Sequence, residues 1–473
     1  MEASYDETTP LLVPEAQHGD AAPQQEQHVK KTPLPKLQVS ALVLAHMGEP
    51  MTAYCIFPFV NQLVSELDIT GGDEKKVGYY VGMIESIFFV TQALFVFHWG
   101  RVSDHVGRKP VLMIGLFGLV IAMLSFGLSK TFLGIVVSRS ICGLLNGNAG
   151  VIKSMMGEIT DSTNMAQGFA FIPVAWSMGS TIAPWIGGQL SKPHERWPTL
   201  FSHPFWSYYP YFLPCALSAA YCAFACAYVS VALKETVKRR SRSSSSPETA
   251  SSDADEPPPL REALTRPVVL SIAVYASLGA IDIAFMALFP LFCATPIALG
   301  GLGLGPPQIG AFLGALGVCD GLFQGLVFSR AVDRLGVRGV LALSLCMFVP
   351  MYALFPVASA VARAYGVGPG VWAIMFAQLA LTCVMDMSYG AVFMVIRSAV
   401  PNNRALGTVN GVAQFVAAVM RAIAPVATTS LFAASLEYNL LGGYFVYVVC
   451  VTASVGVALT PRLLRASGMW FTQ

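Results

Sequence analysis

Long apolar segments recur along this chain of 473 residues, and they restrict its possible folds more than any other feature of the sequence. A helix needs about 20 mostly apolar residues to cross the hydrocarbon core of a bilayer. Windows of that length predict twelve crossings, near residues 38–64, 77–98, 110–129, 131–157, 168–190, 207–233, 267–292, 307–329, 339–360, 370–396, 405–434 and 440–460. Because a bilayer offers the backbone no hydrogen-bond partners, each crossing is expected to be a helix, and the chain an all-α membrane protein.

The balance of residue types also favours a membrane protein. Hydrophobic residues make up 55% of the chain and charged residues only 12%, whereas about 25% of the residues in a soluble domain are charged. So few charges cannot cover a surface that faces water. The ten cysteines lie mostly in apolar segments without a Cys-x-x-Cys pair, so we expect reduced, packed thiols and no metal site.

Polar stretches divide the chain into two halves. Residues 1–36 are polar and contain proline, which is typical of a disordered tail. Residues 234–266 hold a basic run, a serine run and an acidic, proline-rich stretch, which is typical of a flexible linker. The linker separates six predicted crossings in residues 37–233 from six in residues 267–460, and residues 461–473 form a second tail.

Lys and Arg are distributed unevenly over the links between crossings. They concentrate in the N-terminal tail, in residues 99–109, in the linker at residues 234–266 and in residues 330–338. Links that face the cytosol carry such an excess of positive charge. Both termini and the linker are therefore expected to be cytoplasmic.

The link between the second and third crossings has a distinctive sequence, which reads Gly-Arg-Val-Ser-Asp-His-Val-Gly-Arg-Lys from Gly100 to Lys109. Its glycines allow the backbone angles of a tight turn. Asp104 is expected to accept a hydrogen bond from a helix N-terminus, and Arg108 and Lys109 to anchor the link on the cytosolic face. The alternative interpretation is a basic turn in some other multi-span protein.

This link resembles the loop signature of the major facilitator superfamily. All five defining positions match: Gly100, Asp104, Gly107, Arg108 and Lys109. The resemblance implies two pseudo-symmetric six-helix bundles and assigns these residues to conformational gating. A weaker copy, with Asp333, Gly336 and Arg338, occupies the matching place in the second half. Such repeats suit alternating access, in which two similar bundles rock about a central site.

Charged residues inside the predicted crossings need an explanation, because an unpaired charge in a bilayer is costly. Glu49 and Glu85 lie in the first two crossings and Arg139 in the fourth. Arg139, Gly143 and Gly147 follow at four-residue steps, which predicts one helix face. This stretch resembles the superfamily's fourth-span signature, which is associated with proton coupling. We expect Glu49, or else Glu85, to carry the proton beside Arg139; a static Glu49–Arg139 ion pair is the alternative.

The fifth predicted crossing contains the sequence Gly-Ser-Thr-Ile-Ala-Pro-Trp-Ile-Gly-Gly, from Gly179 to Gly188. It resembles the antiporter signature of the drug:proton branch, although Ala183 stands where glycine is usual. Pro184 removes a backbone donor and is expected to kink the helix. Gly187 and its neighbour permit close helix packing.

Residues 233–236 read Leu-Lys-Glu-Thr and resemble an element of fungal and plant relatives of the zinc-induced facilitators. The sequence lacks the Cys-Pro-Gly-Cys element of the plant proteins and any histidine cluster, so zinc transport is not supported. Together the resemblances imply a secondary active transporter that exports a small organic molecule, a drug or metabolite, in exchange for protons. The alternative is a transporter-like nutrient receptor without net transport.

A substrate cavity is expected near mid-membrane, between the two halves. Its candidate lining residues are polar, charged or aromatic side chains of the predicted crossings: Asn146, Trp176, Asp282, Asp320, Gln324, Asp386, Tyr389, Gln414 and Arg421, together with Gln92 and Asn410. Acids outnumber bases among the candidate residues, which favours cationic or neutral amphipathic substrates.

The sequence contains no Walker phosphate-binding loop, hydrolase nucleophile elbow or metal-binding helix motif. We therefore expect no enzyme activity and no cofactor, with a proton gradient as the energy source. The expected partners are a small-molecule substrate and the lipid bilayer, without nucleic acid, and the expected state is a monomer. Glu7, Leu11 and Leu12 form an acidic dileucine pattern in the N-terminal tail, which leaves a vacuolar or endosomal membrane and the plasma membrane as alternatives.

Overall fold

The fold is entirely helical wherever it is described. The computed structural model describes residues 32–161, 163–236, 264–400 and 406–466. Within these ranges no residue belongs to a β-strand, so the expected all-α class is confirmed. Most of the two tails and the linker lies outside them, as does the dileucine pattern of Glu7, Leu11 and Leu12.

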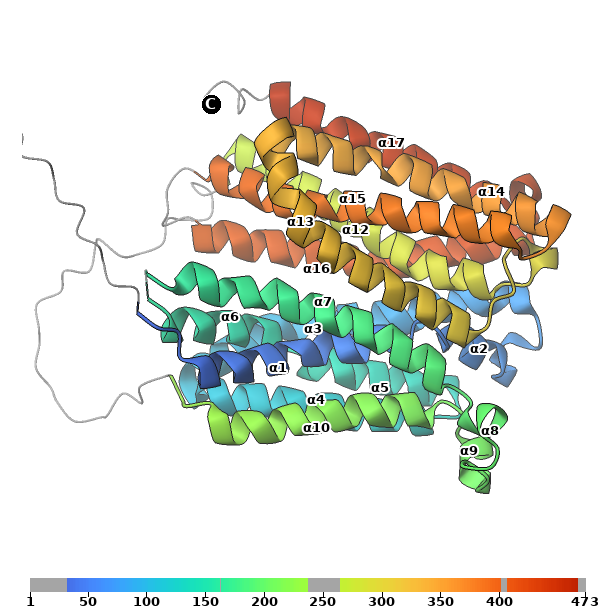
Figure 1. Ribbon diagram of the computed structural model, residues 1–473, viewed down its shortest axis with the longest axis horizontal. Coiled ribbons are helices and arrows are strands. Elements are labelled where there is room, and N and C mark those ends of the chain that lie inside the picture. The colour runs from blue at the N-terminus through green and yellow to red at the C-terminus, as the bar shows by residue number, and fades with distance from the viewer. Residues whose placement is uncertain (1–31, 162, 237–263, 401–405, 467–473) are drawn as a thin grey trace, which may run out of the picture.

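Two groups of long helices run side by side, one from each half of the chain (Figure 1). The helices of the N-terminal half are α1 (Lys36–Tyr54), α2 (Val60–Ser65), α3 (Val77–Val106), α4 (Arg108–Leu128), α5 (Phe132–Leu145), α6 (Asn148–Ile159), α7 (Met165–Leu190), α8 (Pro193–Arg196), α9 (Pro204–Tyr208) and α10 (Phe212–Ala232). Those of the C-terminal half are α12 (Arg266–Ala294), α13 (Pro306–Cys346), α14 (Phe348–Tyr365), α15 (Pro369–Ala399), α16 (Leu406–Glu437) and α17 (Phe445–Ala466).

The number of membrane crossings fits the predicted twelve. Within the described residues, 10 helical stretches are long and apolar enough to cross a membrane. One of them, Pro306–Tyr365, has 60 residues, far more than one crossing needs. It folds back at Gly336, where the helical geometry of α13 is interrupted. The shorter α1 continues through a turn into α2 and supplies the remaining segment of the N-terminal bundle.

The fourth predicted crossing is interrupted at its middle. Helix α5 ends at Leu145, and Asn146 leaves the helical region with a ψ of 74° before α6 begins at Asn148. Asn and Gly are weak helix formers, so this is a favourable place for a break. The expectation of one continuous helix face from Arg139 to Gly147 is therefore not met, because Gly147 lies beyond the end of α5.

The two halves meet along two helix pairs, α3 with α16 and α7 with α13. We call the end of the bundle with α8 and α9 the α8–α9 end, and the opposite end, where the linker joins, the linker end (Figure 1). Hydrogen bonds that join the halves lie toward the α8–α9 end: Tyr79 donates to Glu437 (3.0 Å), Gln189 to the carbonyl of Pro307 (3.0 Å) and the amide of Val426 to Ser86 (3.1 Å). The halves are therefore fastened together at that end.

Backbone contacts close the same end. A Cβ atom on Gly188 of α7 would lie 2.8 Å from the Cα of Gly310 in α13. A Cβ atom on Gly78 of α3 would lie 2.6 Å from the carbonyl oxygen of Thr429 in α16. Distances this short leave no room for a side chain, and small residues are what allow helices in a membrane to approach so closely.

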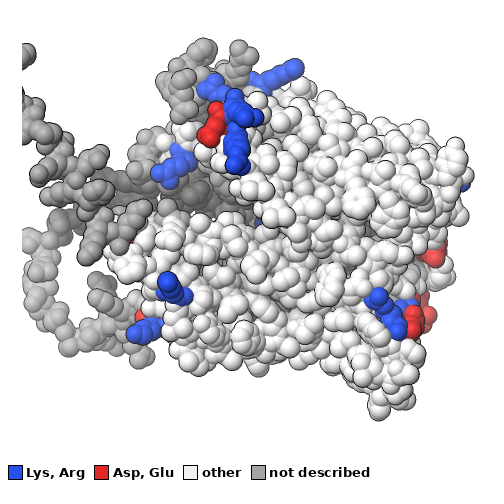
Figure 2. All heavy atoms as spheres, viewed as in Figure 1, with Lys and Arg blue, Asp and Glu red and all other residues white. Residues whose placement is uncertain are grey.

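Toward the linker end, the same helices diverge. In α3, Val81 is fully buried whereas Leu94 is 62% exposed; in α13, Ile309 is fully buried whereas Leu326 is 59% exposed. Figure 2 shows the surface hollowed between the halves at this end, where most of the visible Lys and Arg residues also gather. The cavity between the halves is thus open toward the linker end and closed toward the α8–α9 end.

Candidate functional site

The link between α3 and α4 turns sharply at Gly107. Its φ of 119° and ψ of 152° lie in a region that favours glycine. The carboxylate of Glu235 accepts hydrogen bonds from the backbone amides of Arg108 (3.0 Å) and Lys109 (3.1 Å). These amides have no partner within α4, so Glu235 caps the helix and meets the positive end of its dipole.

The basic side chains of this link contact the ends of other helices. The Arg108 guanidinium donates to Ser103 Oγ (2.7 Å) in α3 and forms an ion pair with Glu158 (3.1 Å) in α6. The Lys109 ammonium donates to the carbonyl of Ser230 (2.7 Å) in α10. The link therefore holds together the linker ends of α3, α4, α6 and α10.

One residue of the loop signature, Gly100, differs from the prediction, and the prediction for Asp104 is not tested. Gly100 lies inside α3, and a Cβ atom there would meet nothing within 4 Å, so no turn requires glycine at this position. The side chain of Asp104 lies outside the described structure. The carboxylate seen at the N-terminus of α4 belongs to Glu235, and the Leu-Lys-Glu-Thr element at residues 233–236 was the only sign of it in the sequence.

The C-terminal half contains a matching turn. Gly336 has a positive φ of 69° and a ψ of 164°, and like Gly107 it joins two helices at the linker end. Asp333 and Arg338 lie on either side of it in sequence. The shared backbone geometry at Gly107 and Gly336 supports an internal repeat of the two halves.

Side chains from both halves interact with the buried carboxylate of Glu49. It precedes Pro50 in α1 and is only 8% exposed. Gln92 of α3 donates to its Oε1 (3.0 Å), while its Oε2 has no hydrogen-bond partner among the described residues. Lys153 of α6 and Arg421 of α16, in the other half, both interact with it electrostatically.

The break between α5 and α6 places Asn146 beside Glu49. Asn146 is only 2% exposed, and among the described residues neither end of its amide has a hydrogen-bond partner. Gly143 and Gly147 let α3 approach this break, since a Cβ atom at either position would overlap a side chain of α3. A buried amide without partners is costly, so this position has hydrogen-bonding capacity that the surrounding side chains do not use.

Arg139 lies beside Glu85 and not beside Glu49. Its guanidinium is 4.7 Å from the centroid of the Phe88 ring and interacts electrostatically with Glu85, both residues of α3. Arg139 and Glu85 are both almost fully buried. The expected pairing of Arg139 with Glu49 is therefore corrected: Arg139 and Glu85 interact inside the N-terminal half, and Glu85 has almost no surface open to the cavity.

Helix α7 carries the close contacts that its glycines predicted. A Cβ atom on Gly179 would overlap α1, one on Gly187 would overlap Cys55 at the end of α1, and one on Gly188 would overlap α13. Pro184 lies inside α7 without ending it. Helix α7 thus packs tightly against its own half along one side and against the C-terminal half along another.

The C-terminal half contributes three acids. The hydroxyl of Tyr389 in α15 donates to Asp282 Oδ2 of α12 (2.6 Å), and the amide of Gln324 donates to Asp320 Oδ1 within α13 (3.0 Å). Asp386 of α15 interacts electrostatically with both Asp320 and Asp282, so the three acids lie near one another.

The polar groups of the two halves adjoin at Tyr54. This α1 side chain interacts electrostatically with Glu49 of its own half and with Asp282, Asp386 and Arg421 of the other half. The expected cavity residues are thus brought to a common region from both bundles, although the side chain of Asn410 lies outside the described structure. Two further candidates lie around it: the ring of Trp176 is 6.3 Å from that of Tyr54, and Gln414 donates to the Tyr275 hydroxyl (3.4 Å).

Three residues without an expected role also belong to this region: Tyr54, His46 and Lys153. The His46 ring is buried in α1, 5.9 Å from the Trp176 ring. Lys153 is exposed to the cavity and interacts electrostatically with His46 and Glu49. Its position inside a predicted crossing was the one signal in the sequence, since an ammonium group there is costly without a partner.

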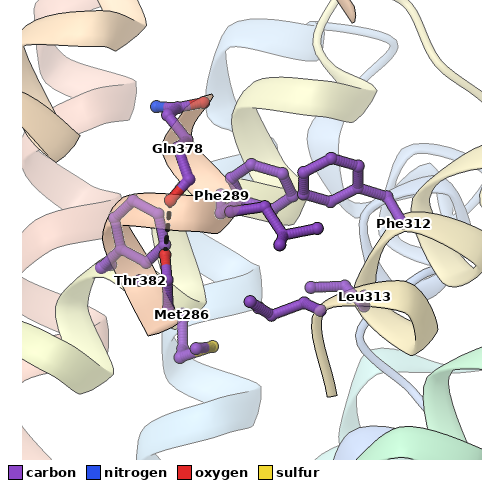
Figure 3. Close-up of a pocket in the computed structure, with 9 residues that line it drawn as sticks. Met286, Phe289, Phe312, Leu313, Gln378 and Thr382 are labelled. Atoms are coloured by element: carbon purple, nitrogen blue, oxygen red, sulfur yellow. Dashed lines mark hydrogen bonds between the residues drawn. The ribbon is translucent and has the colours of Figure 1, made fainter. Parts of the chain in front are cut away.

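A small apolar pocket lies apart from these charges, between α12, α13 and α15 (Figure 3). Phe289, Phe312 and Leu313 form part of its wall. The polar lining residues Gln378 and Thr382 bond to the fold: the Thr382 hydroxyl donates to the Gln378 carbonyl (2.9 Å), and the Gln378 amide donates to a backbone carbonyl of α14 (3.0 Å). No charged residue lines this pocket, so it is distinct from the polar cavity around Tyr54.

A second polar contact fixes the α8–α9 end of the N-terminal half. Glu66 forms an ion pair with Lys192 (2.7 Å) and accepts a hydrogen bond from the Tyr211 hydroxyl (2.8 Å). Burial lowers the pKa of Lys192, but the hydrogen bond and charge of Glu66 outweigh burial and raise that pKa above its usual value. Burial, followed by the charge of Glu66, raises the pKa of Tyr211. Lys192 is therefore charged and Tyr211 neutral at physiological pH.

The arrangement of two helical bundles around a polar cavity agrees with the known family that the sequence matches. The family model of the Major Facilitator Superfamily matches residues 42–425. The chain belongs to the major facilitator superfamily. The expectation drawn from the loop signature is thereby confirmed, and the alternative of an unrelated multi-span protein is excluded.

This superfamily member is similar to fungal efflux proteins and to plant facilitators. It is 30% identical over 464 residues to efflux pump azaK of Aspergillus niger, covering 98% of this chain and 95% of that protein. It is 28% identical over 488 residues to the major facilitator-type transporter psiT2 of Psilocybe cyanescens, covering 92% of each chain. It is also 28% identical to protein ZINC INDUCED FACILITATOR-LIKE 1 of Arabidopsis thaliana, covering 86% of this chain and 87% of that protein.

Solved structures of the superfamily share its fold. The human organic anion transporter MFSD10 superposes with a TM-score of 0.60 at 18% identity, covering 92% of this chain and 100% of that chain. The D-xylose-proton symporter superposes with a TM-score of 0.70 at 14% identity, covering 92% and 97%. The chain is therefore a multi-pass membrane protein of a transporter family, with a major facilitator fold.

Proposed function

We propose that this protein is a secondary active transporter that exports a small organic molecule in exchange for protons. The observation that carries the proposal is Glu49, a carboxylate buried between the halves with one oxygen held by Gln92 and the other without a partner. Its charge matters to both bundles, because Arg421 of the other half interacts with it. Adding or removing one proton at Glu49 therefore changes the energy of bringing the halves together.

The cavity provides the second part of the mechanism. The halves are packed at the α8–α9 end and separated at the linker end. In alternating access, the linker end closes while the Gly188–Gly310 and Gly78–Thr429 contacts open. Substrate enters from the linker end, competes with the proton for the polar groups around Tyr54, and leaves at the α8–α9 end.

The gating residues act at the linker end. Gly107, Arg108 and Lys109 join α3 to α4 and, with Glu235 and the ends of neighbouring helices, fix that end of the N-terminal half as one rigid unit. A rigid unit transmits movement of one helix to the whole bundle, which rocking of the halves requires. Gly100 and Asp104 belong to the same link in sequence, and we assign Asp104 to the same gating function.

Export is the direction that the sequence and the relatives favour. The excess of Lys and Arg at the linker end supports a cytosolic position for that end, both termini and the linker. Of the similar proteins, azaK is named an efflux pump, and mfsB of Aspergillus fumigatus is named a multidrug transporter. We propose a monomer in the plasma membrane or in a vacuolar or endosomal membrane, driven by the proton gradient without a cofactor.

Purified protein in proteoliposomes tests this function. Vesicles with an imposed pH gradient are screened with a panel of labelled metabolites and drugs, and accumulation that collapses when the gradient is dissipated supports the proposal. A nutrient receptor without net transport is the other candidate. It predicts that compounds bind the purified protein but never accumulate in vesicles, whatever the gradient.

A further inference from the structure

Two cations from opposite halves lie across the cavity from one another. Lys153 belongs to α6 and Arg421 to α16, and the two repel each other electrostatically. Lys153 is exposed to the cavity and Arg421 is half-buried. Like charges repel more strongly where bulk water is scarce, so this arrangement resists closure of the linker end unless something neutralises it.

Neither cation has a direct partner. Among the residues that the structure describes, Lys153 and Arg421 make no hydrogen bond and no ion pair, although other cations of the chain do. Ionisable side chains inside membrane proteins ordinarily pair with one another or with backbone carbonyls, and those that do not mark the paths of ions and substrates. Two unpaired cations that face one another therefore require a functional explanation.

The nearby acids that the structure describes form no ion pair with these two cations, because the carboxylates accept hydrogen bonds from neutral donors. Glu49 accepts from the Gln92 amide (3.0 Å), and Asp282 accepts from the Tyr389 hydroxyl (2.6 Å). Each acid is near enough to stabilise a cation at a distance without bonding to it. The donors of Lys153 and Arg421 thus remain available to an oxygen ligand that enters from the cavity.

Aromatic side chains of the same region form the remaining wall. The Trp176 ring packs edge-on against Tyr54, with centroids 6.3 Å apart, and is tilted against His46 at 5.9 Å. Trp176 is only partly buried, so part of its ring is open to the cavity. An aromatic body can stack or pack edge-on against such rings.

We propose that Lys153 and Arg421 together bind the carboxylate of an aromatic organic anion, which bridges the two halves of the transporter. The anion replaces one repulsion with two attractions and so favours closure of the linker end around the substrate. This inference rests on the proposed transport function and names its substrate class. It also differs from the cationic or neutral class that the excess of acids favoured. Acids still outnumber bases when Lys153 is counted, but Glu49 and Asp282 accept hydrogen bonds from neutral donors.

Ligand-dependent thermal unfolding of the purified full chain in detergent tests the site. The probe is benzoate, and benzyl alcohol at the same concentration and ionic strength is the uncharged control. Benzoate is expected to raise the melting temperature in a saturable way, and benzyl alcohol is not. Lys153→Gln and Arg421→Gln should each raise the half-saturating benzoate concentration about tenfold or more, as for loss of one charged partner. The surface variant Lys36→Gln should leave it unchanged.

A second variant guards against simple misfolding. Lys153→Arg keeps the positive charge and the hydrogen-bond donors at this position, so it is expected to unfold near the melting temperature of the parent and to keep the saturable response to benzoate. The proposal is overturned if benzoate gives no saturable shift, if the shift survives in both Gln variants, or if a folded Lys153→Arg variant no longer responds to benzoate. Because this assay needs no gradient and no flux, it separates failure of the site from failure of the transport function.

Discussion

Gln92 Nε2 donates a hydrogen bond to Glu49 Oε1 across 3.0 Å, from α3 to α1. The bond orients the carboxylate and leaves Glu49 Oε2 without a partner among the described residues. A carboxamide is a neutral donor, so it holds Glu49 in place without cancelling its charge. The charge of Glu49 therefore remains available to the proton, to Lys153 and to Arg421 of the other half.

Gly107 and Gly100 give a matched pair of substitutions. Gly107→Ala is expected to destabilise the protein by about 1–3 kcal/mol and to reduce transport, because alanine is strained at a φ of 119°. A Cβ atom there would also lie 2.6 Å from Glu235 Oε2. Gly100→Ala, in the helical backbone of α3 with open space around it, should be neutral or slightly stabilising. The melting temperature and the flux per molecule are measured for both variants. Equal effects of the two substitutions would contradict the assignment of the turn to Gly107.

Glu235→Gln tests the cap of α4. The substitution removes the charge and one of the two acceptor oxygens that bond to the amides of Arg108 and Lys109. We expect a loss of about 1 kcal/mol in stability, as for other helix caps, and slower transport. Glu74→Gln, an exposed acid at the α8–α9 end, is the control for loss of one negative charge. If the control and Glu235→Gln unfold at the same temperature, Glu235 does not cap the helix.

The crossings and the loop signature were predictable from sequence, because apolar length and local spacing determine them. The cap of α4 was not, because Glu235 follows Arg108 by 127 residues and no local pattern joins them. The prediction that Arg139 lies beside Glu49 was also wrong. Periodicity shows which residues share a helix face, but not which neighbouring helix that face meets, and α5 presents Arg139 to Glu85.

The break at Asn146 and the place of Lys153 illustrate a second limit. An apolar stretch from Phe132 to Ile159 is long enough for one crossing, and the backbone angles of Asn146 show where its helix is interrupted. Lys153 could be assigned to a crossing but not to the cavity. Its exposure toward Glu49 depends on how α6 resumes after the break.

Gly188→Ala should open the α8–α9 end. The new methyl group would lie 2.8 Å from the Cα of Gly310. A backbone atom cannot rotate out of the way as a flexible side chain can, so the two helices must move apart. We expect longer distances between spin labels at Glu74 and Tyr438, which lie in opposite halves near that end, measured by pulsed electron resonance. The exposed Cys319 and Cys346 are replaced by Ser beforehand.

The control for this prediction is Gly325→Ala in α13, where a Cβ atom meets nothing within 4 Å. It should leave the distance distribution of the parent unchanged. An unaltered distribution in Gly188→Ala would show that Gly188 and Gly310 do not hold the α8–α9 end closed.

Replacing Leu11 and Leu12 together by Ala tests to which membrane the protein is delivered. If the acidic dileucine pattern with Glu7 is read in the cytosol, the tagged variant should move from a vacuolar or endosomal membrane to the plasma membrane. The rest of the chain should insert and fold as before, because the signal adds no membrane affinity. Fluorescence imaging of the tagged variant and the tagged parent measures their distribution among cell membranes. If both proteins show the same distribution, the dileucine pattern is not a sorting signal.

The most direct test of the whole account is proton-driven accumulation by Glu49→Gln in proteoliposomes. Gln keeps the size of the side chain and cannot carry a proton, so the variant should exchange substrate downhill yet reach an accumulation ratio of about 1 under an imposed pH gradient. Glu85→Gln, which alters a buried acid beside Arg139, should keep gradient-driven accumulation for each folded molecule. If Glu49→Gln still concentrates substrate as the parent does, Glu49 is not the proton carrier and the account is contradicted.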